Sequence, residues 1–255
     1  MGKTLRLVVL SALILVFGPF GRSGEGNDGD RVIRVGTDSG YPPYVFEDPS
    51  GTFRGFEVDL VEALAEKTGL SVEWVDYPFA DLIAALREGA IDAIAAAMSV
   101  TRERARVVAF TEAYEISLST LVVRSGRKDV KALADLAGKR VAALRGSVQE
   151  AFLGSLRAVG AVEALETVED CLEAVRRGEV DGAFMDRPVA VHYVGGKAFA
   201  GELAPAFNME IAGSAKALAV RREDEALLGA LNKALAELKS EGGLAALRDR
   251  WMPLR

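Results

Sequence analysis

The sequence of 255 residues contains one cysteine, Cys171, and one histidine, His192. A single thiol cannot form an intrachain disulfide bond or a thiolate metal cluster, and a single imidazole cannot build a multi-histidine metal site. The scarcity of histidine also argues against a Ser-His-Asp hydrolase. We therefore expect no metal and no cofactor, and we assign no role to either residue.

The sequence also has fewer basic than acidic residues. The chain has 31 lysine and arginine residues against 37 acidic ones, a formal net charge of −6. A surface that binds nucleic acid through its phosphates needs the opposite balance, so nucleic acid is not expected as a partner. Half of the residues are apolar and 27% are charged. This mixture excludes a disordered chain and a multi-span membrane protein, and it indicates a packed core.

The first 30 residues differ in composition from the rest. Lys3 and Arg6 precede an apolar run over residues 7–17, which proline, glycine and serine then interrupt. The run is shorter than the roughly 20 residues that a transmembrane helix needs, and its layout is typical of a secretory signal peptide. A buried first helix is the alternative. We predict a signal peptide over residues 1–24, a linker over residues 25–30, and export to the periplasm or another extracytoplasmic space.

One sequence pattern occurs twice. Residues 83–97 and 172–186 both show a helical segment, a glycine, an aspartate three positions later, and an apolar run. An almost wholly apolar run is typical of a strand buried on both faces of a parallel sheet. The repetition therefore predicts two α/β lobes of similar build.

The carboxyl-terminal tail holds one apolar strand at residues 217–220 and helices at residues 224–240 and 244–251. This is too little sheet for a domain, so the tail is expected to pack on the first lobe. We predict a first lobe of residues 31–122 plus 217–255 and a second lobe of residues 123–216. Two crossing segments of this kind form a hinge.

In open α/β sheets ligands bind beyond the carboxyl ends of the strands. The residues that follow Val35, Ala97, Leu144 and Met185 should therefore line a cleft between the lobes. They include arginines, aspartates, hydroxyl groups and aromatic rings. An α-amino acid needs such a set, because its carboxylate binds donors, its ammonium binds an acidic group and its side chain needs apolar walls.

Each of these residues also has a simpler explanation. The arginines within residues 102–106 are compatible with a solvated helix face, and Asp186 with a helix cap. The aromatic side chains are compatible with core packing. Asp38 and Arg145 could pair only with each other across the cleft.

Four motifs occur in a fixed order along the chain. They are TDSGYPPY at residues 37–44, GFEVDL at 55–60, SVTRER at 99–104 and GSVQE at 146–150. Together they resemble the polar amino-acid solute-binding proteins, the periplasmic receptors of ABC importers, and the resemblance runs from about Arg31 to the carboxyl end. It implies the two-lobed α/β periplasmic-binding-protein fold of type II, with a ligand cleft between lobes joined by a two-strand hinge. It also implies a monomeric receptor that binds one L-amino acid and delivers it to membrane permease subunits.

The resemblance assigns roles at the cleft. Arg104 would bind the ligand carboxylate, Ser99 would add its hydroxyl and Ala97 its backbone carbonyl. Asp186 would bind the α-ammonium group. In the family the position of Val148 is a threonine whose hydroxyl helps to bind the carboxylate, so here only the backbone N–H remains.

The ligand side chain would lie between Tyr41 and Phe79, with Leu144 as a further wall. Asp38 stands where receptors for basic amino acids place the carboxylate that binds the cationic end. Arg145 stands where some glutamine receptors have a lysine. Asp38 and the aromatic residues favour a basic amino acid, whereas Arg145 favours an amide or a carboxylate.

Two other functions use the same fold. The cyclohexadienyl (arogenate or prephenate) dehydratases are enzymes of a related branch, and Glu150 or Asp186 could supply the general acid for that reaction. The ligand-binding half of a sensor is the third interpretation. The intact Ser-x-Thr-x-x-Arg motif favours the transport receptor.

Overall fold

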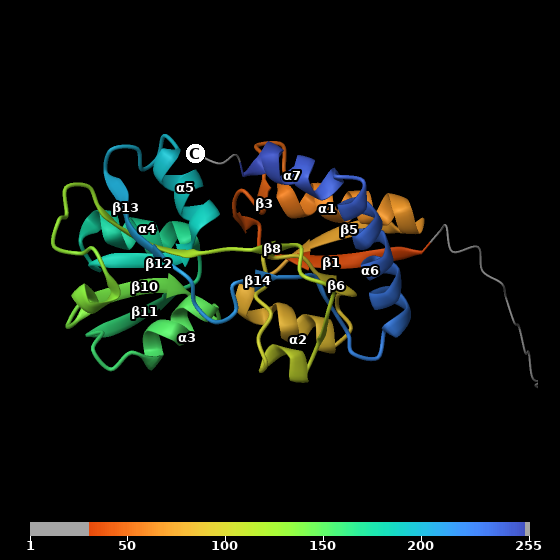
Figure 1. Cartoon of the computed structure of the whole chain (residues 1–255), viewed down its shortest axis with the longest axis horizontal. Helices are drawn as coiled ribbons and strands as arrows, with labels where there is room; N and C mark the ends of the chain where they lie inside the picture. Colours follow the sequence, from red (N-terminus) through yellow and green to blue (C-terminus); the bar gives the residue numbers. More distant parts are fainter. Residues whose placement is uncertain (1–30, 253–255) are drawn as a thin grey trace, which may run out of the picture.

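Two five-stranded sheets organise the part of the chain that the structure, a computed structural model, describes, residues 31–252 (Figure 1). Each sheet has helices on both faces and forms one lobe of an α/β protein. The predicted signal peptide and linker lie outside the described residues. The two-lobed fold of type II that the sequence predicted is confirmed.

The first sheet has the strand order β5-β1-β6-β15-β7. Strand β1 pairs in parallel with β5 and with the central strand β6, and β15 pairs antiparallel with β6 and β7. The carboxyl-terminal part of the chain therefore completes the first sheet. The strands are β1 (Val32–Thr37), β5 (Ser71–Asp76), β6 (Ala93–Ile94), β7 (Ala109–Phe110) and β15 (Ala219–Val220).

The second sheet has the order β11-β10-β12-β9-β13. Strand β9 pairs antiparallel with β12 and β13, so the chain enters this sheet at Ser119, earlier than the boundary after residue 122 that the sequence suggested. The five buried residues Ser119–Val123 explain why this strand lies at an interior position of the sheet. The strands are β9 (Ser119–Arg124), β10 (Arg140–Leu144), β11 (Ala161–Leu165), β12 (Gly182–Asp186) and β13 (Leu203–Met209).

Helices cover both faces of each sheet (Figure 1). In the first lobe α1 (Phe56–Thr68), α6 (Glu225–Ser240) and α7 (Gly243–Trp251) pack together, and α2 (Leu82–Arg87) lies on the opposite face. In the second lobe α4 (Val168–Arg177) and α5 (Arg187–Gly195) lie opposite α3 (Val148–Ser155). The run that begins with β6 shows why both faces are apolar, because Ala93, Ala95 and Ala97 pack on the α1 side while Ile94 and Ala96 pack on the α2 side.

Short strands position the cleft between the lobes. The strands β2 (Gly40–Tyr41), β3 (Val45–Glu47) and β4 (Phe53–Arg54) form a small sheet after β1. Strands β8 (Glu115–Ile116) and β14 (Ala215–Lys216) pair antiparallel and lie between the two lobes (Figure 1). These two strands are the two-strand hinge of the fold.

The repeated aspartate has the same structural role in both lobes. Asp92 Oδ2 accepts a hydrogen bond of 3.0 Å from the backbone N–H of Arg34, and Asp181 Oδ2 accepts one of 2.9 Å from that of Arg140. The N–H of Asp92 donates in turn to the Arg34 carbonyl, and the N–H of Asp181 donates to the Arg140 carbonyl, each at 2.7 Å. In each lobe the aspartate therefore links the glycine turn to a parallel strand, β1 in the first lobe and β10 in the second. This shared role explains why the pattern occurs twice.

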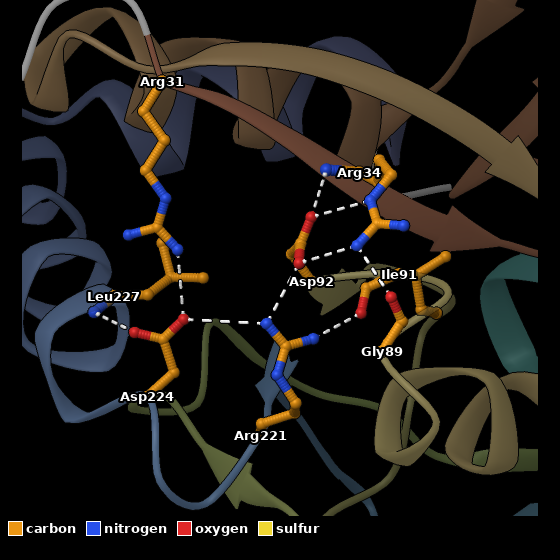
Figure 2. A network of polar contacts seen from close by, with 8 residues as sticks. All are labelled: Arg31, Arg34, Gly89, Ile91, Asp92, Arg221, Asp224 and Leu227. Atoms are coloured by element: carbon orange, nitrogen blue, oxygen red, sulfur yellow. Dashed lines mark hydrogen bonds and ion pairs between the residues drawn. The ribbon is translucent and has the colours of Figure 1, made fainter. Parts of the chain in front are cut away.

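In the first lobe this aspartate is the centre of a polar network (Figure 2). The guanidinium of Arg34 donates to both oxygens of Asp92, and Arg221, just after β15, donates to Oδ1 at 3.0 Å. Burial opposes ionisation of Asp92, but the hydrogen bonds from the two arginines outweigh it and lower its pKa to about 2. Asp224, at the start of α6, pairs with Arg31. The network therefore links the amino-terminal segment of the first lobe to the carboxyl-terminal segment that completes its sheet.

None of the helices within residues 31–252 is long and apolar enough to span a bilayer. In the same residues no three histidine, cysteine, aspartate or glutamate side chains lie close enough together to hold a metal ion.

We predict that Asp92→Ala destabilises the protein by about 2 kcal/mol or more, because it removes charge-assisted hydrogen bonds to two arginines and one backbone N–H. The ionised aspartate stabilises the fold above the pKa of the unfolded chain, so its contribution should disappear as the pH falls from about 4 to about 2. Urea unfolding at pH 7 measures the loss. Asp129→Ala, which removes exposed ion pairs with Arg127 and Lys139, is the control and should cost less than about 1 kcal/mol. Equal losses for the two variants would contradict the assigned role.

Candidate functional site

A pocket lies where the carboxyl ends of strands from both sheets meet. The space that it leaves for a water-sized molecule is about 10 Å³. Its lining comes from the first lobe, the second lobe and the hinge strand β14. The lining residues are Tyr41, Phe79, Ala96, Ala97, Ser99, Arg104, Leu144, Ser147, Val148, Gln149, Asp186 and Lys216.

The carboxylate of Asp186, at the end of β12, is buried in this pocket. Its Oδ2 atom accepts a hydrogen bond of 2.8 Å from the Tyr41 hydroxyl and pairs with Lys216 Nζ at 2.6 Å. Its Oδ1 atom accepts from Gln149 Nε2 at 2.9 Å. Asp186 directly precedes α5, but its side chain makes no capping hydrogen bond there. The carboxylate therefore faces the pocket, and the helix-cap interpretation is wrong.

Arg104 crosses the cleft from the first lobe. Its guanidinium donates to the carbonyl of Ser99 at 2.8 Å and to that of Gly146, in the second lobe, at 2.9 Å. It also lies over the Phe79 ring, 5.3 Å from the centroid. Loss of solvent lowers the pKa of Arg104 to about 10, so it stays cationic at neutral pH. Among residues 31–252 no carboxylate lies within ion-pair distance of this guanidinium.

The neighbouring arginines differ from Arg104. Arg102 and Arg106 are exposed to solvent, and neither lines the pocket. The solvated-face interpretation therefore holds for these two arginines and fails for Arg104.

The backbone of Ala97 has a left-handed conformation with φ of 47°, which is unfavourable for a residue with a side chain. The buried carboxylate of Glu57 stabilises it by accepting the Ala97 N–H at 2.6 Å. The second oxygen of Glu57 accepts from the Tyr114 hydroxyl at 2.6 Å. Glu57, in the GFEVDL motif, therefore holds the strand end from which Ala97 and Ser99 face the pocket.

The structure brings most of the predicted site residues together. Those that line the pocket are Tyr41, Phe79, Ala97, Ser99, Arg104, Leu144, Val148 and Asp186. Tyr41 is also part of the first lobe's core, as the simpler interpretation had it, but its hydroxyl reaches Asp186 in the second lobe.

Asp38 stands behind the aromatic residues rather than in the pocket lining. Its Oδ1 atom accepts from the N–H of Gly40 at 3.1 Å, and its Oδ2 atom from the N–H of Phe79 at 3.2 Å. Burial raises the pKa of Asp38, and these two hydrogen bonds oppose that rise. In this arrangement Asp38 positions the backbone beside both Tyr41 and Phe79.

The structure does not bring Arg145 to the pocket. Its side chain is exposed and turns to the second lobe's own surface, where Nε pairs with Glu166 at 2.6 Å and Nη2 donates to the carbonyl of Ala164 at 2.8 Å. Glu166 directly follows β11, the neighbour of β10, so it offers Arg145 a partner on the same edge. Arg145 therefore pairs neither with Asp38 nor with a group in the cleft.

Sequence reasoning missed four lining residues, Lys216, Gln149, Ser147 and Ala96. Gln149 and Ser147 belong to the GSVQE motif, so the motif itself was the signal. Lys216 was visible only as one cation within the apolar stretch of residues 215–220. A charged residue in such a stretch must find a partner in the interior, and that could have identified it.

Glu57 supplies a prediction on pH dependence. Burial raises the pKa of Glu57 to about 7, although the hydrogen bonds from Tyr114 and Ala97 oppose the rise. The unfolded chain ionises this group near pH 4.5, so the folded protein loses stability as the pH rises from about 4.5 to about 7, by about 3 kcal/mol. Urea unfolding of the wild type and Glu57→Gln at pH 5 and pH 8 should show this loss only in the wild type. Parallel pH profiles would contradict it.

Known proteins resemble the whole described chain. The model of the bacterial extracellular solute-binding proteins, family 3, matches residues 33–253. The L-arginine-binding protein of Pseudomonas aeruginosa is 30% identical over 234 residues, which cover 87% of this chain and 88% of that protein.

Two solved structures are informative. An ancestral arginine-binding protein bound to arginine has a TM-score of 0.82 at 32% identity and covers 87% of this chain and 98% of its own. An ancestral amino acid-binding protein that is a precursor of cyclohexadienyl dehydratase has a TM-score of 0.76 at 29% identity, with coverage of 86% and 94%.

Proposed function

The chain belongs to family 3 of the bacterial extracellular solute-binding proteins, and we propose that it is an extracytoplasmic receptor that binds a basic L-amino acid between its lobes and delivers it to an ABC importer. The observation that carries the proposal is the Arg104 guanidinium, which lines the pocket from one lobe and donates to the Gly146 carbonyl of the other. A desolvated guanidinium of this kind binds a carboxylate strongly.

The rest of the pocket supports an amino acid with a cationic side chain. Asp186 supplies a buried carboxylate for the α-ammonium group, and Tyr41 and Phe79 supply aromatic faces that suit a cation. The Asp38 carboxylate contacts the backbone beside both rings, so a cationic side chain between them would end near it. The similarity to arginine-binding proteins supports the same ligand class.

The proposal extends to location and partners. We propose that residues 1–24 direct export, that the receptor acts as a monomer, and that the permease subunits of the importer receive the amino acid. The net charge of −6 argues against nucleic acid as a partner.

A dehydratase is the second candidate, because one similar structure is a precursor of that enzyme. The reaction needs a protonated acid beside the leaving hydroxyl group. Asp186 is instead ion-paired with Lys216, and Glu150 accepts the N–H of Gly146 at 2.6 Å and does not line the pocket. Neither group is therefore arranged as a general acid, and the receptor is the better interpretation.

A ligand screen tests the function. We expect arginine, lysine or histidine to raise the melting temperature of the exported chain, since a ligand at 100 times its Kd stabilises a fold by about 2.7 kcal/mol. Glutamine, glutamate, leucine, arogenate and prephenate complete the screen. The receptor proposal is wrong if no amino acid shifts the transition while prephenate is consumed to phenylpyruvate.

Arg104→Ala should weaken amino-acid binding by at least about 30-fold, because a buried charged partner of the ligand carboxylate is worth about 2 kcal/mol or more. Arg102→Ala is the matched control, since this arginine is exposed two residues away, and it should bind as the wild type does. Titration calorimetry measures both. Similar losses at the two positions would show that the carboxylate is bound elsewhere.

A further inference from the structure

Lys216 is a buried cation that joins the hinge to both lobes. Its side chain is 2% exposed. The backbone of β14 is fixed to the first lobe, because Ala215 accepts the N–H of Val100 and Ala217 donates to Met98. The ammonium group reaches Ser99 Oγ in the first lobe at 2.9 Å and Asp186 Oδ2 in the second lobe at 2.6 Å.

This position coincides with the one that a ligand's α-ammonium would need. Asp186 is the buried acceptor proposed for that group, and its Oδ2 atom already binds Lys216 and Tyr41. A second ammonium on the same carboxylate would lie beside the Lys216 ammonium in a site with little solvent. Two cations this close repel each other strongly where the local dielectric constant is low. An α-amino acid can therefore use Asp186 fully only if Lys216 leaves it.

Lys216 has a second carboxylate within its own hinge. Glu115 lies directly opposite Lys216 in the β8–β14 pair. Side chains at opposite positions of an antiparallel pair have Cβ atoms about 5 Å apart, well within the reach of a lysine. Glu115 is buried, and its Oε2 atom accepts no hydrogen bond from any residue in the described range 31–252.

The other charged groups near Lys216 leave Glu115 as the available partner. Glu57 is close, but its two oxygens already accept the Ala97 N–H and the Tyr114 hydroxyl. Burial raises the pKa of Glu115, while Tyr44, Arg248 and Lys216 oppose that rise. A cation that approached the free Oε2 atom of Glu115 would thus further stabilise a buried carboxylate.

We infer that Lys216 is an internal competitor for the ligand's ammonium site: it pairs with Asp186 across the lobes and moves to Glu115 when an α-amino acid binds. The inference rests on the proposed function and adds a residue that sets affinity. Competition lowers the apparent affinity by the fraction of molecules in which Lys216 has left Asp186. It acts only on ligands that carry an α-ammonium group.

A pair of ligands isolates this effect. Arginine and 5-guanidinopentanoate share the carboxylate and the guanidinium, but only arginine has the α-amino group. Titration calorimetry with both ligands on the whole exported chain compares the wild type with Lys216→Met, Glu115→Gln and the control Lys239→Met. Lys239 is an exposed lysine outside the pocket that donates to the Ala113 carbonyl.

Lys216→Met should bind arginine at least about tenfold more tightly than the wild type and should not gain affinity for 5-guanidinopentanoate. Glu115→Gln should bind arginine at least about fivefold more weakly, because the displaced lysine loses its partner, with no change for 5-guanidinopentanoate. Lys239→Met should change neither affinity. If Lys216→Met does not fold, as judged by circular dichroism, the result with Glu115→Gln decides by itself.

Equal losses for both ligands in Lys216→Met would overturn the inference, because they would make Lys216 an ordinary supporting residue of the pocket. An unchanged arginine affinity in Glu115→Gln would overturn it too. Both results leave the receptor function intact. If the wild type binds another amino acid instead of arginine, that amino acid and its analogue without the amino group replace the pair. If it binds none, the proposed function and the inference fail together.

Discussion

A charge that is removed from water must be paired, and the rest of the structure depends on how the buried carboxylate of Asp186 is paired. Its donors are Tyr41 from the first lobe, Gln149 from the second lobe and Lys216 from the hinge. No single lobe can satisfy the carboxylate. The two lobes and the hinge therefore share one polar cluster around Asp186.

The two lobes are held together internally by equivalent aspartate contacts. An aspartate after a glycine turn binds the backbone N–H of Arg34 in one lobe and of Arg140 in the other. In the first lobe, arginines from distant parts of the sequence then join Asp92 (Figure 2). Each lobe is thus held together by its own aspartate, and the hinge strands β8 and β14 connect the two lobes.

Much of this arrangement could be predicted from the sequence because it depends on backbone pattern. The apolar runs within residues 83–97 and 172–186 follow from periodicity, and they placed the strand ends, and Asp186 with them, at one cleft, while the family resemblance identified Arg104. Side-chain direction at the ends of strands could not be predicted in the same way. Arg145 pairs with Glu166 because that carboxylate directly follows β11, the strand beside β10. The sequence alone does not show which strands are neighbours.

Lys216 was missed for a related reason. Its role comes from two residues far away in the sequence, Ser99 and Asp186, and from one that is opposite only after β8 and β14 have paired. The apolar residues around it indicate a buried strand, and one cation inside such a strand does not reveal its partner. Propensity describes the strand, whereas the tertiary fold determines which carboxylate the lysine meets.

The hinge has a special position in this chemistry. In a receptor whose hinge is only a flexible connection, ligand charge and lobe motion are coupled solely through the two cleft walls. Here the hinge strands carry an acid and a base, Glu115 and Lys216, and the base reaches the carboxylate on which the ligand's ammonium would depend. A change of charge at Asp186 therefore acts on the hinge directly, through a single side chain. Because binding and closure involve the same ion pair, a ligand that replaces Lys216 at Asp186 changes the electrostatics of the cleft and of the hinge in one step.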